Sequence, residues 1–316
     1  MRVAFFGTPT FAVPTLDAIA ASSHTIAGVI TQPDRARGRG QQVTLAPVKA
    51  RALALGVPVL QPDRLKDEGF LEAFDRLGAD IGVVAAYGRL LPQVLLDRPR
   101  LGLVNVHASL LPRWRGAAPI HRAVIAGDRE AGITIMRVVL ALDAGAMLAT
   151  AATLIDPDET SMALEARLAT MGATRLVEVL DRLARGPVTE TPQDEARVTY
   201  AHRLERADGD LDWARPAREV HDRIRGLHPW PHAAARLGDR RVLLIESRVA
   251  HETPTDQEPG TVIVSGADGL VVATAPGAVR LLRLQPEGRP VMAVRDFLNG
   301  RPVHVGDRFT PPIRPA

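Results

Sequence analysis

The sequence predicts an α/β protein, with a Rossmann-like domain built on a mostly parallel sheet and a small C-terminal β-barrel of OB-like type after it. Short apolar runs alternate with helical patterns through the first half of the chain. A polar, proline-containing stretch follows, and beyond it short apolar runs lie close together. A length of 316 residues is comfortable for two domains. We therefore predict a first domain at 1–187, a linker at 188–205 and the barrel domain at 206–316.

Short apolar runs bounded by turn residues indicate buried strands in the first domain. These predicted strands are Val3–Phe6, Thr25–Thr31, Val57–Leu60, Ile81–Ala86 and Leu103–His107. Helical patterns occupy Lys66–Leu77, Pro119–Ala126 and Ser161–Leu183. Strands that are separated by helices are joined by right-handed crossovers and lie parallel in one sheet, which is the basis of the Rossmann-like prediction.

The chain changes character after Leu183. Gly186–Thr199 carries prolines and acids but little apolar content, which is typical of an extended linker. One helical pattern follows at Ala217–Arg225. Short strand-like runs separated by Gly, Asp and Pro then indicate a small barrel or sandwich. These runs are Arg241–Ile245, Thr261–Val264, Gly269–Ala273 and Val279–Leu284.

Missing residues and motifs exclude several classes of chemistry. The chain has no cysteine, so disulfides, thiolate-bound metals and a cysteine nucleophile are excluded. The first predicted strand is followed by Gly7-Thr8-Pro9-Thr10 and not by a glycine-rich dinucleotide fingerprint. The Walker, zinc-protease and serine-hydrolase motifs are also missing. Because no apolar stretch approaches the ~20 residues of a membrane span, we expect a cytoplasmic protein.

Two polar residues interrupt an apolar predicted strand. Asn105 and His107 lie two residues apart in Leu103–His107, so their side chains face the same side near the end of the strand, where open α/β sheets bind ligands. Asp143, after the strand-like run Ile133–Val139, supplies a carboxylate. An oxyanion donor, an imidazole and a carboxylate without a nucleophile favour direct transfer between two bound substrates. Structural polar residues and an ordinary turn aspartate are the alternatives.

Basic residues gather in two stretches without acids. Four arginines and one lysine lie within 35–51, and a second group surrounds the predicted site, where Trp114 stands between Arg113 and Arg115. A solvated basic face is the ordinary explanation of such runs. In a chain whose net charge is only +3, two of them favour a polyanion that is guided toward the site.

The whole chain resembles the methionyl-tRNA formyltransferases, a family of folate-dependent enzymes. Asn105–Ile120 is similar to the catalytic run specific to folate-dependent formyltransferases. The C-terminal matches separate the tRNA-dependent enzymes from their relatives. Other matching runs are Phe6–Pro9, Thr31–Arg35, Gly38–Gly40, Pro47–Lys49, Ala86–Gly88, Gly132–Met136, Thr199–Ala201, Asp212-Trp213, Pro229–Pro231 and Leu284–Pro286.

The resemblance implies formyl transfer from 10-formyltetrahydrofolate, a co-substrate, to the methionine amino group of charged initiator tRNA, for translation initiation. In this reaction Asn105 and His107 would hold the formyl oxygen as it becomes an oxyanion, and Asp143 would tune His107 and assist proton removal from the amine. The resemblance implies no metal and no permanently bound cofactor. We expect a monomer.

The resemblance also implies two sets of binding residues. The expected folate site comprises Ser109, Leu110, Leu111, Pro112, Tyr87 and Gly88. The expected tRNA contacts are Arg35, Arg37, Arg39, Lys49, Arg113 and Arg115. The loop around Arg39 would lie against the acceptor end, and the C-terminal barrel would grip the tRNA backbone.

The sequence departs from the family pattern near the predicted acid. The family tends to read M-D-x-G-L-D-T-G-D, whereas this chain reads VVLALDAGA over Val138–Ala146. Asp143 is kept, and the altered positions include Val139, Ala141, Ala144 and Ala146. Gln41 and Gln42 stand where lysines are common. Two alternatives remain: a formyltransferase acting on an amino-sugar nucleotide, and a degenerate member that binds folate or tRNA without turnover.

Overall fold

The computed structural model describes residues 1–37, 42–250, 256–266, 269–300 and 302–312, and the chain divides into two compact units. Unit 1 comprises Met1–Pro119, Ala131–Thr153 and Glu165–Ala201. Unit 2 comprises Ile120–Glu130, Leu154–Leu164 and His202–Ala316. Most of the stretch that was predicted to be a linker therefore packs within unit 1, and two short segments of the predicted first domain pack within unit 2.

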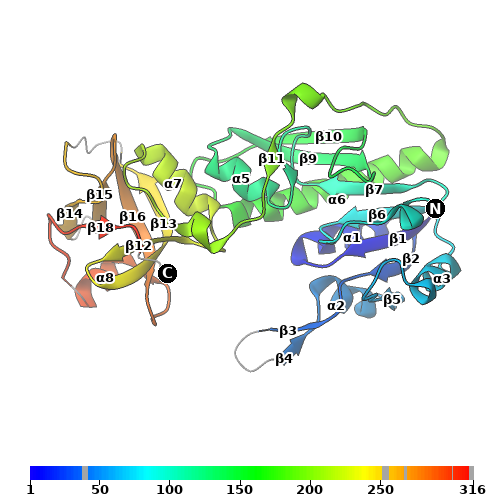
Figure 1. The fold of residues 1–316 in the computed structure, drawn as a ribbon, viewed down its shortest axis with the longest axis horizontal. Coiled ribbons are helices and arrows are strands. Elements are labelled where there is room, and N and C mark those ends of the chain that lie inside the picture. The colour runs from blue at the N-terminus through cyan, green and yellow to red at the C-terminus, as the bar shows by residue number, and fades with distance from the viewer. Residues whose placement is uncertain (38–41, 251–255, 267–268, 301, 313–316) are drawn as a thin grey trace. The chain divides into compact units, whose positions relative to one another are not determined.

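Unit 1 is built on a mostly parallel sheet with strand order β10-β9-β7-β6-β1-β2-β5 (Figure 1). β1 pairs in parallel with β2 and β6, and β6 pairs in parallel with β7, whereas β9 is antiparallel to β7. The strands are β1 (Arg2–Gly7), β2 (Thr25–Ile30), β5 (Val59–Leu60), β6 (Ile81–Ala85), β7 (Leu103–His107), β9 (Glu130–Arg137) and β10 (Met147–Leu154). Val3, Phe5 and Phe6 are fully buried, as the continuous apolar runs predicted.

Helices join these strands at amphipathic segments of the sequence. In α3 the buried residues Phe70, Leu71 and Phe74 recur at helical spacing, and Asp67 caps the helix by accepting a hydrogen bond from the Phe70 N–H at 3.2 Å. Burial of each such side chain contributes roughly 1.5–3 kcal/mol. The helices of this part of the chain are η1 (Thr10–Ala12), α1 (Val13–Ala20), α2 (Pro47–Ala54), α3 (Glu68–Arg76), α4 (Gln93–Leu96), α5 (Pro119–Ile125), α6 (Ser161–Arg185) and η2 (Glu195–Arg197).

Two small strand pairs supplement the main sheet of unit 1. β3 (Arg35–Arg37) and β4 (Gln42–Thr44) are antiparallel, and they flank residues 38–41, which lie outside the described part of the chain. β8 (Arg115–Gly116) pairs in parallel with β11 (Tyr200–Ala201). This second pair ties the stretch 188–201 to the segment that follows β7.

Unit 2 contains an antiparallel curled sheet, a half-barrel, with strand order β14-β15-β16-β13-β12-β18, and β17 pairs with β16. Its strands are β12 (Ala233–Leu237), β13 (Arg240–Val249), β14 (Val262–Gly266), β15 (Gly269–Ala273), β16 (Ala278–Pro286), β17 (Met292–Ala293) and β18 (Phe309–Thr310). Its helices are η3 (Arg206–Gly209), α7 (Ala217–Gly226) and α8 (Val294–Gly300). The predicted fold class, a Rossmann-like domain with a mostly parallel sheet followed by a small β-barrel domain, is confirmed, and the second sheet curls into a half-barrel.

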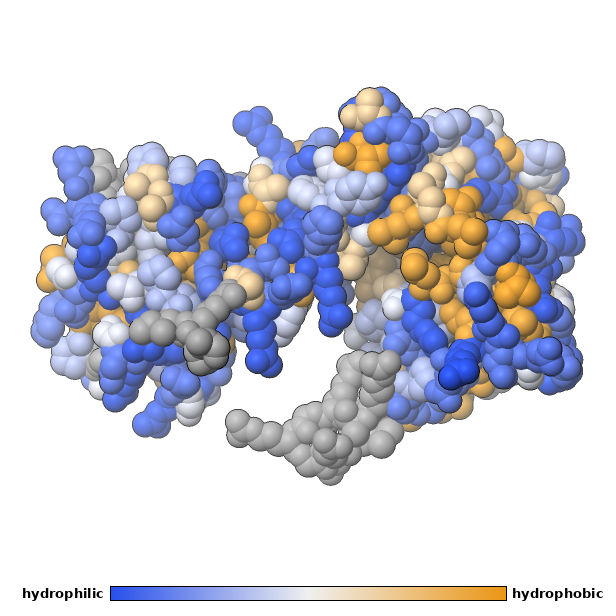
Figure 2. All heavy atoms as spheres, in the orientation of Figure 1, coloured by the Kyte–Doolittle hydropathy of each residue, from blue (hydrophilic) through white to orange (hydrophobic). Residues whose placement is uncertain are grey.

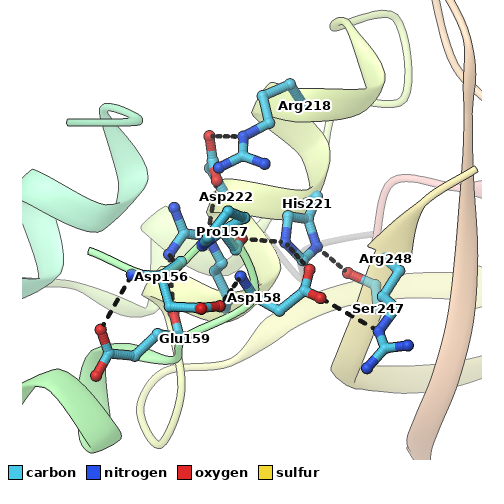
Figure 3. Close-up of polar contacts among 10 residues, drawn as sticks. Asp156, Pro157, Asp158, Glu159, Arg218, His221, Asp222, Ser247 and Arg248 are labelled. Carbon is cyan, nitrogen blue, oxygen red and sulfur yellow. Dashed lines mark hydrogen bonds and ion pairs between the residues drawn. The ribbon is translucent and has the colours of Figure 1, made fainter. Parts of the chain in front are cut away.

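A buried polar cluster holds the segment before α6 onto α7 within unit 2 (Figure 3). The His221 ring contacts the Ser247 hydroxyl through Nδ1 and the Pro157 carbonyl through Nε2, both at 3.0 Å. On the same helix Asp222 accepts from Arg225 at 2.7 Å, and both side chains are 3% exposed. Each buried charge thus has an oppositely charged partner, as burial requires.

The described residues include no helix that is long and apolar enough to cross a bilayer. Figure 2 shows that apolar residues gather on part of the viewed face of unit 1, over its sheet, while charged and polar residues cover much of the rest. Patches of this kind on one face of a protein often mark a binding surface.

Candidate active site

Asn105 and His107 are positioned by the last residues of β7. Both belong to the stretch that pairs with β9, where Asn105 lies opposite Met136 and His107 lies opposite Thr134. Residues two apart on a strand point to the same face, so the two side chains project together at the carboxyl end of β7. His107 is only 5% exposed, and Asn105 is half-buried.

The hydrogen bond of His107 determines which ring nitrogen carries its proton. Nε2 lies 3.0 Å from the carbonyl oxygen of Trp114. Because a carbonyl oxygen only accepts, Nε2 must be the protonated nitrogen, and Nδ1 of the neutral ring carries the lone pair. Nδ1 faces Oδ2 of Asp143 at 3.7 Å. A proton taken up at Nδ1 therefore creates an imidazolium directly beside a carboxylate.

Asp143 lies in the turn between β9 and β10, with a backbone φ of 47°. Its Oδ2 accepts a hydrogen bond from the Gly116 N–H at 2.8 Å, and its side chain is 15% exposed. Gly116 itself has a φ of 122°, and a Cβ there would lie 2.7 Å from the Ala201 carbonyl oxygen. Glycine is required because a larger residue would collide with β11 and displace the donor to Asp143.

Thr134 organises the loop that follows His107. Its hydroxyl donates to the Ser109 carbonyl at 2.7 Å and accepts from the Leu111 N–H at 3.1 Å. The Ser109 hydroxyl donates to the Arg113 carbonyl at 2.7 Å. Sequence reasoning did not select Thr134, because its burial and its position opposite His107 follow from the pairing of β7 with β9.

The predicted folate residues lie in loops that leave neighbouring parallel strands. Tyr87 and Gly88 follow β6, and Ser109–Pro112 follows β7, so both loops emerge at the same edge of the sheet. The Tyr87 carbonyl accepts from the Gln32 amide at 2.8 Å, and burial raises the pKa of the Tyr87 hydroxyl. In the turn before Asp143, Leu140 is 63% exposed and adds apolar surface near the acid.

The predicted tRNA-binding residues occupy different environments. Arg113 is exposed, and its guanidinium stacks over the Trp114 ring at 4.4 Å. Arg115 is 3% exposed and donates to Gln193 and Glu195 at 2.7–3.2 Å. This burial gives no support to the prediction that Arg115 contacts tRNA, because its guanidinium is enclosed and engaged within unit 1.

The remaining predicted tRNA contacts belong to the region between β2 and α2. Arg35 and Arg37 lie on β3, and Arg39 falls outside the described residues. The Lys49 ammonium contacts the Asp34 carboxylate and the Gln61 side-chain oxygen. Its hydrogen bond lowers the pKa of the Asp34 carboxyl below the ordinary value. Among the described residues, no group of three or more histidines and acids could hold a metal ion.

Comparison with known proteins assigns the chain to a family. A family model described as formyl transferase matches residues 1–180, and one described as formyl transferase, C-terminal domain, matches residues 203–302. The chain is 46% identical over 309 residues to the methionyl-tRNA formyltransferase of Roseobacter denitrificans, which covers 98% of this chain and 99% of that relative. The chain belongs to the methionyl-tRNA formyltransferase family. A second member, from Methylococcus capsulatus, is 47% identical over 299 residues, 95% of this chain and 96% of that relative.

Solved structures share the fold at lower identity. WlaRD, a sugar 3N-formyl transferase solved in the presence of dTDP and 5-N-formyl-THF, matches with a TM-score of 0.68 at 16% identity, over 92% of this chain and 99% of that one. HypX from Aquifex aeolicus, in complex with tetrahydrofolic acid, matches with a TM-score of 0.67 at 16% identity, over 99% of this chain and 51% of that one. These likenesses concern the fold alone. Membership of the methionyl-tRNA formyltransferase family confirms the resemblance and supports the tRNA-dependent enzyme over the sugar-nucleotide alternative.

Proposed function

We propose that this protein transfers the formyl group of 10-formyltetrahydrofolate to the amino group of methionine on initiator tRNA, for translation initiation. The observation that carries the proposal is the approach of His107 to Asp143 at the carboxyl end of β7, with Asn105 on the same face of that strand, in a chain that belongs to this family. We expect the reaction to occur in the cytoplasm and the protein to be a monomer.

The reaction needs stabilisation of one developing charge. The methionine nitrogen attacks the formyl carbon, a new carbon–nitrogen bond forms, and the formyl oxygen becomes an oxyanion. The Asn105 amide donates to this oxygen, and protonated His107 donates to it from Nδ1. Donors that are already fixed in place before the reaction stabilise such a charge effectively, because no solvent has to reorganise.

Proton transfer completes the exchange. The attacking nitrogen loses one proton, and N10 of the folate gains one as its bond to the formyl carbon breaks. Asp143 holds a negative charge beside Nδ1, so it stabilises the imidazolium form of His107 and assists proton removal by accepting a hydrogen bond from the attacking amine. The number of protons is unchanged overall, and no covalent enzyme intermediate is required.

The substrates would approach from the edge of the sheet where the β6 and β7 loops emerge. The Tyr87–Gly88 and Ser109–Pro112 loops are proposed to line the folate site, and the exposed side chain of Leu140 offers apolar surface for a flat ring. Arg113, Lys49 and β3 are proposed to meet the tRNA. Arg115 is left out of this surface because it is buried.

The proposal is tested by formyl transfer from 10-formyltetrahydrofolate to methionine-charged initiator tRNA, with uncharged tRNA as the blank. We expect turnover by the natural protein and a fall of about 10²–10³-fold in kcat for Asn105→Ala, the loss typical of one oxyanion donor. Asn299→Ala, at an exposed position of α8, is the matched control and should leave kcat unchanged. Transfer to an amino-sugar nucleotide without transfer to the tRNA would overturn the proposal.

A further inference from the structure

A segment far along the chain wraps around the catalytic loops of unit 1. We call residues 190–201 the strap. It begins with the ion pair between Glu190 and Arg137, at 2.8 Å, and a pair of backbone hydrogen bonds between Thr191 and Met147, at 2.8 and 2.9 Å. It ends with the pairing of β11 on β8. The strap therefore spans both the turn that carries Asp143 and the loop that follows His107.

Gln193, in the middle of the strap, links these two loops through its side-chain amide. Nε2 donates to the backbone carbonyls of Asp143, at 2.7 Å, and Gly145, at 2.8 Å. Oε1 accepts from Nε of Arg115 at 2.9 Å. Gln193 is only 8% exposed. Both N–H groups of the amide and its oxygen thus form hydrogen bonds to the two catalytic loops. Because Gln193 is buried, water has little access to take the place of these hydrogen bonds.

Thr199 extends the same connection to His107. Its hydroxyl accepts a hydrogen bond from the Trp114 N–H at 2.9 Å, and its carbonyl accepts from the Arg115 N–H, also at 2.9 Å. The Trp114 carbonyl is the group that binds Nε2 of His107. The strap therefore holds the residue that fixes the His107 tautomer, while Gln193 holds the backbone of the residue that faces Nδ1.

The backbone at both catalytic loops depends on outside support. Asp143 has a φ of 47° and Trp114 a φ of 64°, in the left-handed region that residues other than glycine rarely adopt. Such conformations persist only where surrounding contacts fix them. The strap supplies a contact to each of these residues, through Gln193 and Thr199. The other contacts that support the 3.7 Å approach of Asp143 to His107 include the Gly116 N–H and the backbone hydrogen bond from Arg137 to Ala146 at 2.9 Å.

We propose that Gln193 is a positioning residue for formyl transfer, acting through Asp143, an inference that rests on the proposed function. It touches neither reacting atom. Its amide fixes the position of the Asp143 turn relative to the Trp114–Gly116 loop. The Asp143 carboxylate is therefore held close to the His107 imidazole when the oxyanion forms. A catalytic group displaced by about 1 Å can lose on the order of 10²-fold in rate.

The test compares three variants in steady-state and single-turnover formyl transfer. We expect Gln193→Ala to lower kcat about 10- to 100-fold while the KM values for both substrates change less than about threefold. Gln193→Glu keeps an acceptor for Arg115 but turns a second oxygen toward the carbonyls of Asp143 and Gly145, and it should lose at least as much. Glu190→Gln, the matched control, removes the ion pair between the strap and the Arg137 side chain but leaves the Gln193 hydrogen bonds to Asp143 and Gly145 in place, and it should retain kcat.

Two further readouts separate positioning from folding. Each variant is compared by thermal unfolding, and the kcat loss is normalised to the fraction of enzyme active in a single-turnover burst. A kcat within twofold of the natural protein in Gln193→Ala, or a loss confined to KM or to the active fraction, would overturn the inference. Absence of formyl transfer in the natural protein would instead overturn the proposed function, so the two failures are distinguishable.

Discussion

His107 in unit 1 and His221 in unit 2 occupy similar surroundings with different consequences. His107 is 5% exposed and His221 is 1% exposed. Each places Nε2 at 3.0 Å from a backbone carbonyl, of Trp114 and Pro157 respectively. Each also lies near a carboxylate, at 3.7 Å for Asp143 and 3.4 Å for Asp158.

The difference lies at the second ring nitrogen. Nδ1 of His221 bonds to the Ser247 hydroxyl at 3.0 Å, whereas Nδ1 of His107 faces Asp143 at a distance beyond hydrogen-bond reach. Burial lowers the pKa of His221, and its ring has both nitrogens occupied as a neutral group. Burial and a nearby acid therefore do not identify a catalytic histidine. A ring nitrogen left available beside a carboxylate, at the end of a parallel strand, is the more informative feature.

The largest effect expected from this comparison is on turnover. His107→Ala should lower kcat by about 10²–10⁴-fold, the range of one acid–base group, with the fold retained. His221→Ala should leave kcat within about twofold, because it removes a side chain of unit 2 whose two ring nitrogens both contact structural partners. The measurement is formyl transfer at saturating substrates, with circular dichroism to verify folding. Comparable losses in both variants would contradict the distinction between the two histidines.

A second expectation concerns the donor that holds Asp143 against His107. Gly116→Ala places a Cβ 2.7 Å from the Ala201 carbonyl oxygen at a φ of 122°. We expect a loss of roughly 1–3 kcal/mol in unfolding free energy, together with a lower kcat because the N–H moves away from Asp143. Chemical denaturation measures the first and steady-state kinetics the second.

Gly56→Ala is the matched control for this substitution. Gly56 has a φ of 67°, and nothing lies within 4 Å of an added Cβ. An alanine at this position therefore has a strained backbone but no steric collision. It should lose stability without losing kcat. If Gly116→Ala behaved in the same way, the hydrogen bond to Asp143 would not matter for turnover.

The placement of Asn105 and His107 could be predicted from the sequence because it depends on a local rule. Strand alternation places Asn105 and His107 on one face. Asp143 does not follow from the strand order, because β9 is antiparallel to β7 and ends beside Val104, so that the turn after β9 has to return toward His107. Thr134 and Gln193 could not be found in this way. Their roles depend on pairing across β7 and β9 and on a strap about 50 residues beyond Asp143, and neither local periodicity nor motif spacing records such contacts.

The sequence also predicted only part of unit 2. The predicted strands from Arg241 onward correspond to β13–β16, but β12, β17 and β18 were not predicted. β12 begins two residues after the proline-rich segment 229–231 with three alanines, which have low strand propensity, and β17 and β18 span two residues each. The inclusion of 154–164 in unit 2 depends on the contacts of His221 and Arg225, which only the folded chain reveals.

A third expectation is the pH dependence of stability that His221 contributes. Since burial lowers its pKa below the ordinary 6.5, the unfolded chain binds its proton more readily than the folded chain does. The contribution is fully present above pH 6.5 and is lost as the pH falls from there toward the folded pKa, with a slope of at most about 1.4 kcal/mol per unit. The groups around the ring that also carry charge are Asp158, Asp222 and Arg225.

His221→Ala isolates this contribution by difference. The variant should be about 1–3 kcal/mol less stable at pH 7.5, because the Ser247 hydroxyl and Pro157 carbonyl lose their partner. The gap between the two proteins should narrow as the pH falls below 6.5. Urea unfolding across pH 5–8 measures it, and a constant gap would show that His221 titrates alike in the folded and unfolded chains.

The smallest expected effect extends the comparison to two neighbouring arginines, one exposed and one enclosed. Arg113 stacks over Trp114 at the surface, whereas Arg115 is 3% exposed between Gln193 and Glu195. If Arg113 meets a tRNA phosphate, Arg113→Ala should raise the KM for tRNA only a few-fold and reduce the slope of log affinity against log salt by about 0.7–0.9. Arg76→Ala, at an exposed position of α3, should leave that slope unchanged. An unchanged affinity and an unchanged salt slope in the Arg113→Ala protein would instead place the tRNA elsewhere, since one lost phosphate contact must release one fewer counterion.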